Sequence, residues 1–363
     1  MCSDRPEKAD DNGEVFFEYL RREHPEIRSF FVISGDSTDY ERIRKIGPIL
    51  KVGSIRHKLL YLFTECAISS QAIIYAATEY RKISAYNDII CKTKTVFLQH
   101  GIIKDDLSSF LAYKKHNFFG FVTSVEREYE SILHGNYGYT EKNLWLTGLP
   151  RFDKLYCAEP RYITFMPTWR SYLMAPPKLR CNFREISSSF MQSSYFRFYH
   201  AVFNDERLFE AAKKYGYKLA VLPHPQMQKF IDEFAPNPAF LLLGVDRELS
   251  YREIYAASAL VVTDYSSAIF DFSYLRKPVI YTQFDKDEFF SNHTYTKGYF
   301  DYERDGLGEV EYDLDAAVER IIEYMRNGCK LKDKYRRRIE AFFTFNDKNC
   351  CRRIFDKITA PER

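Results

Sequence analysis

Short apolar runs that end abruptly in polar, glycine or proline residues recur along this chain, and helical patterns separate them. Phe30–Ser34 (FFVIS) stops at Gly35, and Leu260–Thr263 stops at an acidic turn that contains two serines. Continuous apolar runs of this length are typical of strands buried on both faces, as in a parallel sheet. Because helices connect parallel strands, the alternation predicts an α/β fold with doubly wound parallel sheets.

The expected elements divide between two halves of the chain. In the first half we expect helices at residues 14–23, 57–64 and 125–133, and strands at residues 30–34, 48–52, 67–70, 95–98, 121–124 and 144–147. In the second half we expect strands at residues 161–166, 218–222, 239–243, 260–263 and 279–281. The helices there are expected at residues 193–215 (as one or two), 251–257, 267–274, 314–326, 333–345 and 351–358. Residues 172–189 are polar and poorly periodic, which predicts a loop. A helix precedes the first expected strand, although a doubly wound domain usually opens with a strand.

The length of 363 residues exceeds one ordinary core and favours two domains. The boundary falls near residues 151–161, where a helical stub precedes a new strand. We therefore expect an N-terminal domain at residues 1–155 and a C-terminal domain at residues 156–345. A tail helix within residues 346–363 could pack back on the N-terminal domain.

Composition and charge exclude several classes of protein. The 53 basic and 50 acidic residues give a net charge of only +3, which argues against a nucleic-acid-binding or polybasic membrane protein. The sequence contains no run of about 18 apolar residues, so it predicts no membrane span. The polar N-terminus lacks the apolar core of a signal peptide. Eight cysteines without a C-x-x-C pair favour a reducing, cytoplasmic compartment.

The segment TDYSSAIFD at residues 263–271 is the strongest candidate for an anion site. Ser266 and Ser267 lie where the N-cap and first turn of a helix are expected. Free backbone N–H groups and the helix dipole favour an anion there, at the carboxyl end of a parallel strand. Taken alone, the two serines are better explained as a simple helix cap.

Two histidines each follow an expected strand directly. His224 lies between two prolines in LPHP, and an extended turn there could aim it at a phosphate or a hydroxyl. His100 lies in FLQHG beside Gly101, which allows close approach of backbone or ligand. A neutral histidine is the natural base at cytosolic pH. A core histidine bonded to backbone is the alternative for His224, but its flanking prolines favour function. His100 alone would more often be structural, and the matched pair of histidines favours function.

Two arginines follow expected strands in the same manner. Arg151 ends the motif GLPR and could offer two donors to a phosphate, although a surface salt bridge is preferred for an isolated arginine. Arg170 follows Thr168 and Trp169 after the strand ITFM. Trp169 fits a stacking role and a core role equally.

Metal and nucleotide motifs give weaker signals. The D-x-D that begins at Asp285 holds a metal in some sugar-nucleotide enzymes, but it fits a solvated acidic loop as well, so we predict no metal site. Neither a P-loop nor a dinucleotide fingerprint occurs.

The motifs FLQHG, TGLPRFD, MPTWRS, LPHP, TDYSSAIFDFSYLRKPVIY and GYFDYE occur in this order. Together they resemble the CDP-glycerol glycerophosphotransferase family, the teichoic-acid and capsule polyol-phosphate transferases, over nearly the whole chain. The block TDYSS-x-x-x-D followed by KP is the specific part. The resemblance implies a GT-B-like fold of two Rossmann-like domains with a cleft between them, the first for the acceptor and the second for the CDP-linked donor.

The resemblance also implies roles for individual residues. His100 would be the base that acts on the acceptor hydroxyl, with Gln99 and Gly101 on the acceptor side. The donor's diphosphate and polyol would be surrounded by Arg151, Thr168, Arg170, His224, Ser266, Ser267 and Asp271, and His224 would also be catalytic. FLQHG departs from the commoner family form, which has Trp before the histidine and Thr after the glycine. The resemblance therefore specifies the donor more closely than the acceptor.

The expected reaction transfers glycerol phosphate, or a related polyol phosphate, from CDP-glycerol or CDP-ribitol to an acceptor hydroxyl, with release of CMP. The acceptor would be a polymer or lipid-linked, which leaves peripheral contact with the inner face of the cell membrane open. No helix shows a strongly basic amphipathic face. The sequence requires no cofactor and leaves Mg²⁺ open. Two alternatives remain, a GT-B glycosyltransferase that uses a nucleotide sugar and a non-catalytic polymer-binding module.

Overall fold

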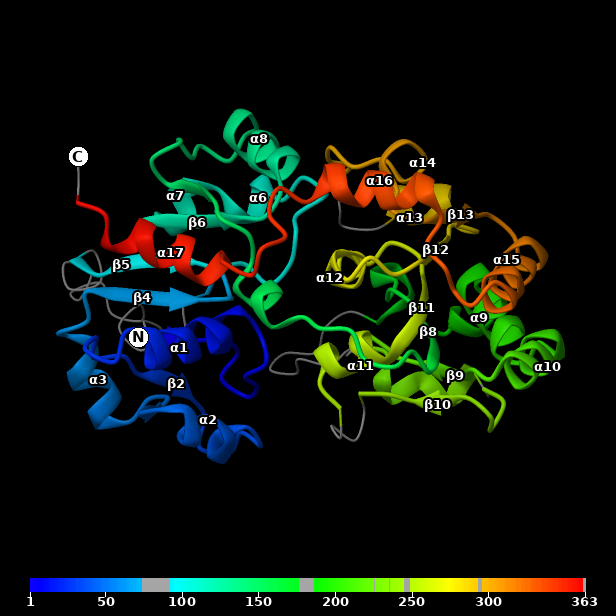
Figure 1. The fold of residues 1–363 in the computed structure, drawn as a ribbon, viewed down its shortest axis with the longest axis horizontal. Coiled ribbons are helices and arrows are strands. Elements are labelled where there is room, and N and C mark those ends of the chain that lie inside the picture. The colour runs from blue at the N-terminus through cyan, green and yellow to red at the C-terminus, as the bar shows by residue number, and fades with distance from the viewer. Residues whose placement is uncertain are drawn as a thin grey trace. The chain divides into compact units, whose positions relative to one another are not determined.

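The computed structural model describes residues 1–73, 92–175, 186–224, 226–234, 236–244, 249–292 and 296–361. The chain forms two compact units, each with its own parallel sheet (Figure 1). Unit 1 comprises Met1–Ile103, Leu107–Leu155 and Phe342–Arg363. Unit 2 comprises Lys104–Asp106 and Tyr156–Ala341. The predicted α/β class with parallel sheets is confirmed.

The sheet of unit 1 has the strand order β3-β2-β1-β4-β5-β6-β7. Its strands are β1 (Cys2–Ser3), β2 (Phe31–Ile33), β3 (Ile49–Lys51), β4 (Cys66–Ser69), β5 (Lys94–Phe97), β6 (Gly120–Thr123) and β7 (Leu144–Leu146). Its described helices are α1 (Asn12–Glu23), α2 (Tyr40–Ile46), α3 (Ile55–Tyr61), α6 (Ser108–Leu111), α7 (Tyr113–His116), α8 (Glu126–His134), η3 (Pro150–Lys154) and α17 (Cys350–Thr359).

The first strand of unit 1 corrects the expectation that a helix opens the chain. β1 consists only of Cys2 and Ser3, and it pairs in parallel with both β2 and β4. Two residues are too short for an apolar run, so no sequence pattern marks this strand. The strand order nevertheless reverses at β1 and β4, which is the point of an open α/β sheet where ligands bind.

The sheet of unit 2 has the order β10-β9-β8-β11-β12-β13. Its strands are β8 (Tyr162–Met166), β9 (Lys218–Val221), β10 (Leu241–Leu242), β11 (Ser258–Thr263), β12 (Val279–Thr282) and β13 (Glu309–Glu311). The helices that begin in it are η4 (Ser171–Leu173), η5 (Phe190–Gln192), α9 (Ser194–Phe203), α10 (Glu206–Tyr215), η6 (Gln228–Phe234), α11 (Tyr251–Ala257), α12 (Ile269–Tyr274), α13 (Lys286–Asn292), α14 (Tyr302–Asp305), α15 (Leu314–Arg326) and α16 (Asp333–Phe342). Here the order reverses between β8 and β11.

The expected helix at residues 193–215 is two helices, α9 and α10. Asp205 separates them because its carboxylate accepts the backbone N–H of Arg207 and caps α10. The expected loop at 172–189 contains η4, and residues 176–185 of that prediction lie outside the described residues.

Aromatic side chains fill much of the interior of both units. In unit 2, Phe165, Phe203 and Phe240 are buried with ring centroids 5.2–6.0 Å apart. In unit 1, Phe97 and Phe121 pack in the same way at 5.1 Å. Phe side chains therefore fill much of the core of each unit.

The C-terminal helix α17 packs within unit 1. The Asp153 carboxylate in η3 accepts the backbone N–H groups of Cys350 and Cys351, each at 2.9 Å, so it caps the first turn of α17. Further along the helix, Phe355 stacks on His24 with ring centroids 3.7 Å apart. Among the residues described, none of the helices combines the length and apolar content that a bilayer span requires.

Candidate functional site

Four neighbouring strands of unit 2 end in polar segments, and three of these segments carry predicted donor residues. Thr168 follows β8, His224 follows β9, Ser266 follows β11 and Asp285 follows β12. All four strands are parallel and adjacent in the sheet. Their carboxyl ends therefore form one edge, and the edge includes the reversal of strand order between β8 and β11.

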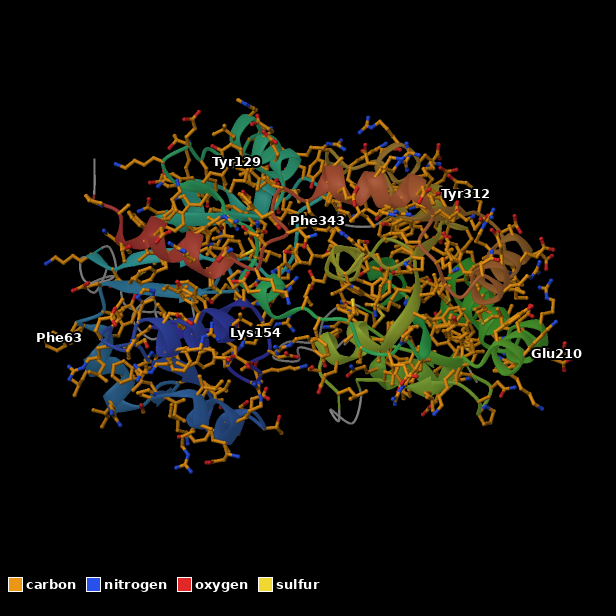
Figure 2. All side chains as sticks on the ribbon, in the orientation of Figure 1. Phe63, Tyr129, Lys154, Glu210, Tyr312 and Phe343 are labelled. Carbon is orange, nitrogen blue, oxygen red and sulfur yellow. The ribbon has the colours of Figure 1, made fainter. Side chains whose placement is uncertain are left out.

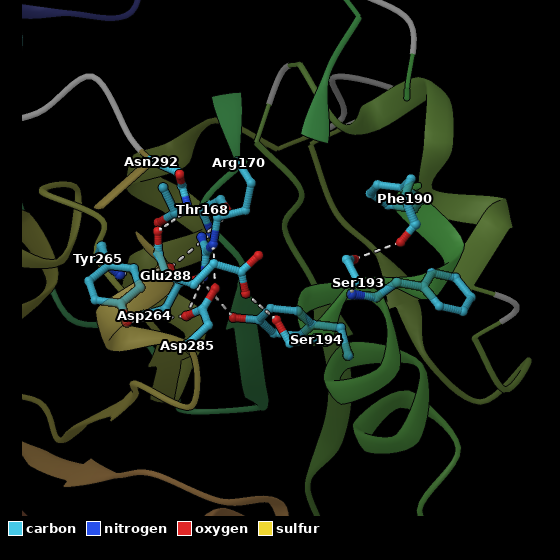
Figure 3. Close-up of polar contacts among 12 residues, drawn as sticks. Thr168, Arg170, Phe190, Ser193, Ser194, Asp264, Tyr265, Asp285, Glu288 and Asn292 are labelled. Carbon is cyan, nitrogen blue, oxygen red and sulfur yellow. Dashed lines mark hydrogen bonds and ion pairs between the residues drawn. The ribbon is translucent and has the colours of Figure 1, made fainter. Parts of the chain in front are cut away.

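Arg170, in the segment that follows β8, forms a buried ion-pair network (Figure 3). The side chains of Arg170, Asp264 and Asp285 are each 0% exposed. Nε of Arg170 donates to Oδ2 of Asp285 at 2.8 Å, and Nη2 donates to Oδ2 of Asp264 at 2.9 Å and to Oδ1 of Asp285 at 3.1 Å. Nη1 donates to the Thr168 carbonyl at 2.6 Å. One guanidinium thus joins the segments that follow β8, β11 and β12.

Aromatic rings surround the network. The Cζ atom of Arg170 lies 4.6 Å from the ring centroid of Tyr195, 5.1 Å from that of Tyr265 and 4.8 Å from that of Phe289. Burial raises the pKa of Asp285, and the Arg170 cation opposes that shift. Because Arg170 is buried and bonds to the segments that follow three strands, it is suited to positioning those segments.

Asp264 also holds the backbone of two strand ends. Its Oδ1 accepts the backbone N–H of Thr168 at 2.9 Å and that of Tyr265 at 2.7 Å, while Oδ2 accepts the hydroxyl of Tyr199 at 3.1 Å. Asp264 lies within TDYSS, and no role was expected for it from the sequence. An acidic residue directly after a buried strand was the signal that could have singled it out.

The serines of TDYSS correct the expected helix start. α12 begins at Ile269 with Ala268 as its N-cap and without a side-chain cap. Ser266 instead accepts the backbone N–H of Ala268 through Oγ at 3.2 Å, in the turn between β11 and α12. Ser267 is exposed in the same turn, and Asp271 is buried in the first turn of α12. Both hydroxyls therefore lie at the strand end rather than in the helix.

His224 is oriented by its own turn. Its Nδ1 accepts the backbone N–H of Gln226 at 3.2 Å, so the neutral imidazole carries its proton on Nε2. The ring stacks on Trp169 with centroids 5.8 Å apart and an interplanar angle of 22°. The following residue, Pro225, lies outside the described residues. His224 is thus preset as a hydrogen-bond donor through Nε2, which suits a phosphate oxygen.

His100 in unit 1 follows β5 and exposes its side chain to solvent. Nη1 of Arg151 donates to the His100 carbonyl at 2.8 Å and to Oδ1 of Asp11 at 2.7 Å. Arg151 therefore lies in unit 1 beside the predicted base. His100 is solvent-exposed, but the protein around its ring partly desolvates the imidazole and so lowers the pKa of His100; Asp11 opposes this shift, and Arg151 and Arg5 lower the pKa further. The imidazole is therefore neutral at physiological pH and able to accept a proton.

The start of α1 connects the segment after β5 with η3, a role that was not expected from the sequence. The fully buried Asn12 donates from Nδ2 to the Gln99 carbonyl at 2.7 Å and accepts the Arg151 N–H at 2.9 Å. The Asp4 carboxylate after β1 accepts the N–H groups of Gly13 and Glu14 and caps the helix. The sequence DDNGE shows a helix start, but nothing local in it indicates contact with the segment after β5.

Two predicted acceptor-side residues flank His100. Gln99 is 1% exposed, and its amide bonds within unit 1. Gly101 is partly buried. Across the described ranges, no group of three or more His, Cys, Asp or Glu side chains is arranged to hold a metal ion.

Comparison with protein families and curated proteins gives consistent matches. Residues 1–360 match the family described as CDP-Glycerol:Poly(glycerophosphate) glycerophosphotransferase. The chain is 38% identical over 356 residues to the minor teichoic acid biosynthesis protein GgaB of Bacillus subtilis (strain 168), which covers 98% of this chain and 39% of that protein. It is 25% identical over 260 residues to the teichoic acid poly(ribitol-phosphate) polymerase of Bacillus spizizenii, which covers 69% of this chain and 39% of that protein. The chain thus spans well under half of the length of these relatives.

Solved structures share the fold. A structure of the wall teichoic acid polymerase TagF matches with a TM-score of 0.69 at 14% identity, over 98% of this chain and 87% of that chain. Another TagF structure, obtained with CDPG, also matches with a TM-score of 0.69. A putative UDP-N-acetylglucosamine 2-epimerase from Listeria monocytogenes matches at 0.57 and 13% identity, over 99% of this chain and 96% of that chain. These likenesses confirm the expected GT-B-like α/β fold.

Proposed function

We propose that this chain, which belongs to the CDP-glycerol:poly(glycerophosphate) glycerophosphotransferase family, transfers glycerol phosphate or a related polyol phosphate from a CDP-polyol to an acceptor hydroxyl. The observation that carries the proposal is the edge formed by Thr168, His224 and Ser266 after three adjacent parallel strands. Sheets of this kind bind nucleotides at such an edge. The TagF structure with CDPG supports a CDP-linked donor.

The donor's diphosphate is proposed to bind in unit 2. Nε2 of His224 and the hydroxyls of Ser266 and Ser267 are the donors that would meet its oxygens. Thr168 adds a further group, because its Oγ1 is buried and no group in the described part of the chain hydrogen-bonds to it. A bound phosphate would satisfy this hydroxyl. Asp271 is proposed to serve the polyol hydroxyls.

The proposed reaction forms one phosphodiester bond. The acceptor hydroxyl oxygen attacks the β-phosphorus of the CDP-polyol while the bond to the bridging oxygen breaks and CMP leaves. His100 of unit 1 takes the proton of the attacking hydroxyl. Hydrogen-bond donors in unit 2 stabilise the charge that collects on the transferring and departing phosphates.

The first prediction tests the reaction itself. We expect the purified protein to release CMP from CDP-glycerol or CDP-ribitol in an acceptor-dependent manner, and the acceptor to gain one polyol phosphate by mass. UDP-N-acetylglucosamine serves as the competing donor, and a parallel reaction with EDTA measures the contribution of divalent cations. Release of UDP without CMP would indicate a glycosyltransferase instead. Donor binding without turnover would indicate a binding module.

A membrane contact is proposed for α3 of unit 1. The helix and the turn after it expose Ile55 (78%), Leu59 (55%) and Phe63 (82%), and Phe63 lies at the edge of unit 1 (Figure 2). Arg28 and Arg56 line the hollow beside these apolar side chains. Each apolar side chain buried contributes about 1.5–3 kcal/mol, and each basic residue near anionic lipid about 1 kcal/mol. The sequence predicted a helix here but not its exposed apolar face.

We therefore expect the double variant Ile55→Glu, Phe63→Glu to bind phosphatidylglycerol vesicles at least about 10-fold more weakly than wild type, because it loses two apolar anchors. Co-flotation with vesicles measures the binding. Met191→Glu, which alters an exposed apolar side chain of unit 2, is the matched control and should float like wild type. Equal flotation of the double variant and wild type would refute the proposed contact.

A further inference from the structure

The turn that carries His100 is built on a residue in an unfavourable backbone conformation. Gln99, directly before His100, has φ +61°, which lies in the left-handed region. Residues other than glycine and asparagine rarely adopt this conformation unless the surrounding structure enforces it. The nearby Gly101 does not have a positive φ, so the left-handed position of the turn is occupied by Gln99 and not by the glycine.

The side chain of Gln99 is held by the next strand and helix of unit 1. Its Nε2 donates to the Val122 carbonyl at the end of β6 at 2.6 Å and to Oε1 of Glu128 in α8 at 3.1 Å. Both Gln99 and Glu128 are buried, at 1% and 0% exposure. A buried amide with two partners on a neighbouring strand and helix fixes the turn in a way that an exposed side chain could not.

Glu128 also binds the backbone of the same turn at Ile103. Its Oε1 also accepts the backbone N–H of Ile103 at 2.6 Å, and Oε2 accepts the backbone N–H of Ser124 at 2.8 Å. One carboxylate therefore bonds to the residue before His100 and to the third residue after it. All the partners in these contacts are N–H donors, which suits an acceptor-only carboxylate.

The backbone on the other side of the turn is pinned as well. Asn12 bonds to the Gln99 carbonyl and Arg151 bonds to the His100 carbonyl. The backbone of the turn is thus held by residues of α1, η3 and α8, whereas His100 itself is exposed to solvent. Such support is what holds a reacting group within about 0.5 Å of its working position.

We propose that Gln99 and Glu128 are positioning residues that hold the left-handed turn and thereby aim the imidazole of His100 at the acceptor hydroxyl. This inference rests on the proposed function, since it takes His100 as the base. It gives Gln99 a role within the protein in place of contact with the acceptor. Glu128 has no motif of its own and is identified by its contacts alone.

Two substitutions test whether the contacts of the turn affect the orientation of His100 and not only the stability of the fold. Gln99→Gly removes the amide but adopts a positive φ freely, so it relieves backbone strain while it releases the turn. Glu128→Gln keeps the shape but turns an amide N–H₂ toward a backbone N–H. Both should lower kcat about 10- to 100-fold, because misplacement of a catalytic group by about 1 Å costs on that order. KM for CDP-glycerol should stay within about threefold, because the proposed donor groups lie in unit 2.

The matched control is Glu14→Gln. Glu14 is a buried carboxylate of unit 1 that pairs with Arg42 and does not bond to the His100 turn. This variant should keep kcat within about threefold of wild type even where its Tm falls as far as that of Glu128→Gln. A second readout is the imidazole ¹⁵N and ¹³C signal of His100, which should broaden or shift in Gln99→Gly and stay unchanged in Glu14→Gln.

His100→Ala distinguishes the two possible failures. If His100→Ala keeps its turnover, the base assignment fails whatever Gln99 does. If His100→Ala loses turnover while folded Gln99→Gly and Glu128→Gln keep kcat within about threefold and leave the His100 signal unchanged, the positioning role is overturned. If Glu128→Gln does not fold, Gln99→Gly alone tests the positioning role. This variant loses the amide contacts but also relieves the backbone strain at residue 99.

Discussion

Replacing His100 by alanine should lower acceptor-dependent CMP release by about 10²- to 10⁴-fold, the range that a positioned general base contributes. The effect should fall on kcat rather than on KM for CDP-glycerol, because the alanine removes no proposed donor contact. His134→Ala is the matched control, since it removes an exposed histidine that pairs with Glu130 at the surface. Turnover by His100→Ala within a few-fold of wild type would show that the base is another group.

The pH dependence of kcat/KM provides an independent check on the same base. Partial desolvation by the surrounding protein lowers the pKa of His100; Asp11 opposes this shift, and Arg151 and Arg5 add to it. A base must be unprotonated, so the acid limb of the profile should lie below the pH of an ordinary histidine, about 6.5. Arg151→Gln removes one nearby cation and leaves Asp11 unpaired, so the limb should move to higher pH. A limb that moves to lower pH would contradict the assignment.

Glu128 must be separated from His100 in that profile. Burial raises the pKa of Glu128 to about 7, while hydrogen bonds from Ser124, Ile103 and Gln99 act in the opposite direction. Protonation of its carboxylate would weaken the grip on the turn within the same pH range. Glu128→Gln removes this titration, so the limb that remains in the variant belongs to His100.

Local changes of polarity were sufficient to predict the strands and the polar residues that follow them. LPHP and TDYSS each place polar groups directly after an apolar run, and such a change marks a strand end whatever the rest of the fold does. His224 and Ser266 could therefore be placed at the carboxyl edge of a parallel sheet from sequence. The helix start after Ser267 could not, because a serine pair fits both a cap and a turn.

Partners that are distant in sequence could not be predicted. Arg170 binds Asp264 and Asp285, which lie 94 and 115 residues further along the chain. They meet only because β8, β11 and β12 are neighbours in the sheet. Arg151 likewise binds Asp11 across 140 residues, which joins it to the His100 turn. Non-local pairing of this kind leaves no periodic signal in the sequence. From the sequence, Arg170 and Arg151 were therefore both expected to donate hydrogen bonds to a phosphate.

Replacing Arg170 by methionine should lower the free energy of unfolding of unit 2 by about 3–5 kcal/mol at pH 7, because it leaves two buried carboxylates without their cation. Methionine fills most of the volume, so the loss comes from charge rather than from a cavity. The chain has two tryptophans, Trp145 in unit 1 and Trp169 beside Arg170 in unit 2. In a Trp145→Phe background, the fluorescence of Trp169 during urea unfolding therefore reports on unit 2.

The pH dependence of the stability deficit distinguishes buried carboxylates left without a cation from a simple packing defect. Burial already raises the pKa of Asp285, and removal of Arg170 removes a group that lowers it. A carboxyl whose pKa is raised on folding stabilises the folded state below its unfolded pKa and loses that contribution as pH rises through the folded pKa. The deficit of Arg170→Met should therefore be largest near neutral pH and shrink toward about pH 4.

Neutralising the carboxylates should recover part of the loss. The triple variant Arg170→Met, Asp264→Asn, Asp285→Asn carries no buried charge at this position, so it should be more stable than Arg170→Met at pH 7. Its deficit should also vary less with pH. Arg44→Met breaks an exposed pair with Glu41 and, as the matched control, should cost under about 1 kcal/mol. A deficit in Arg170→Met that grows as the pH falls would contradict the buried-charge explanation.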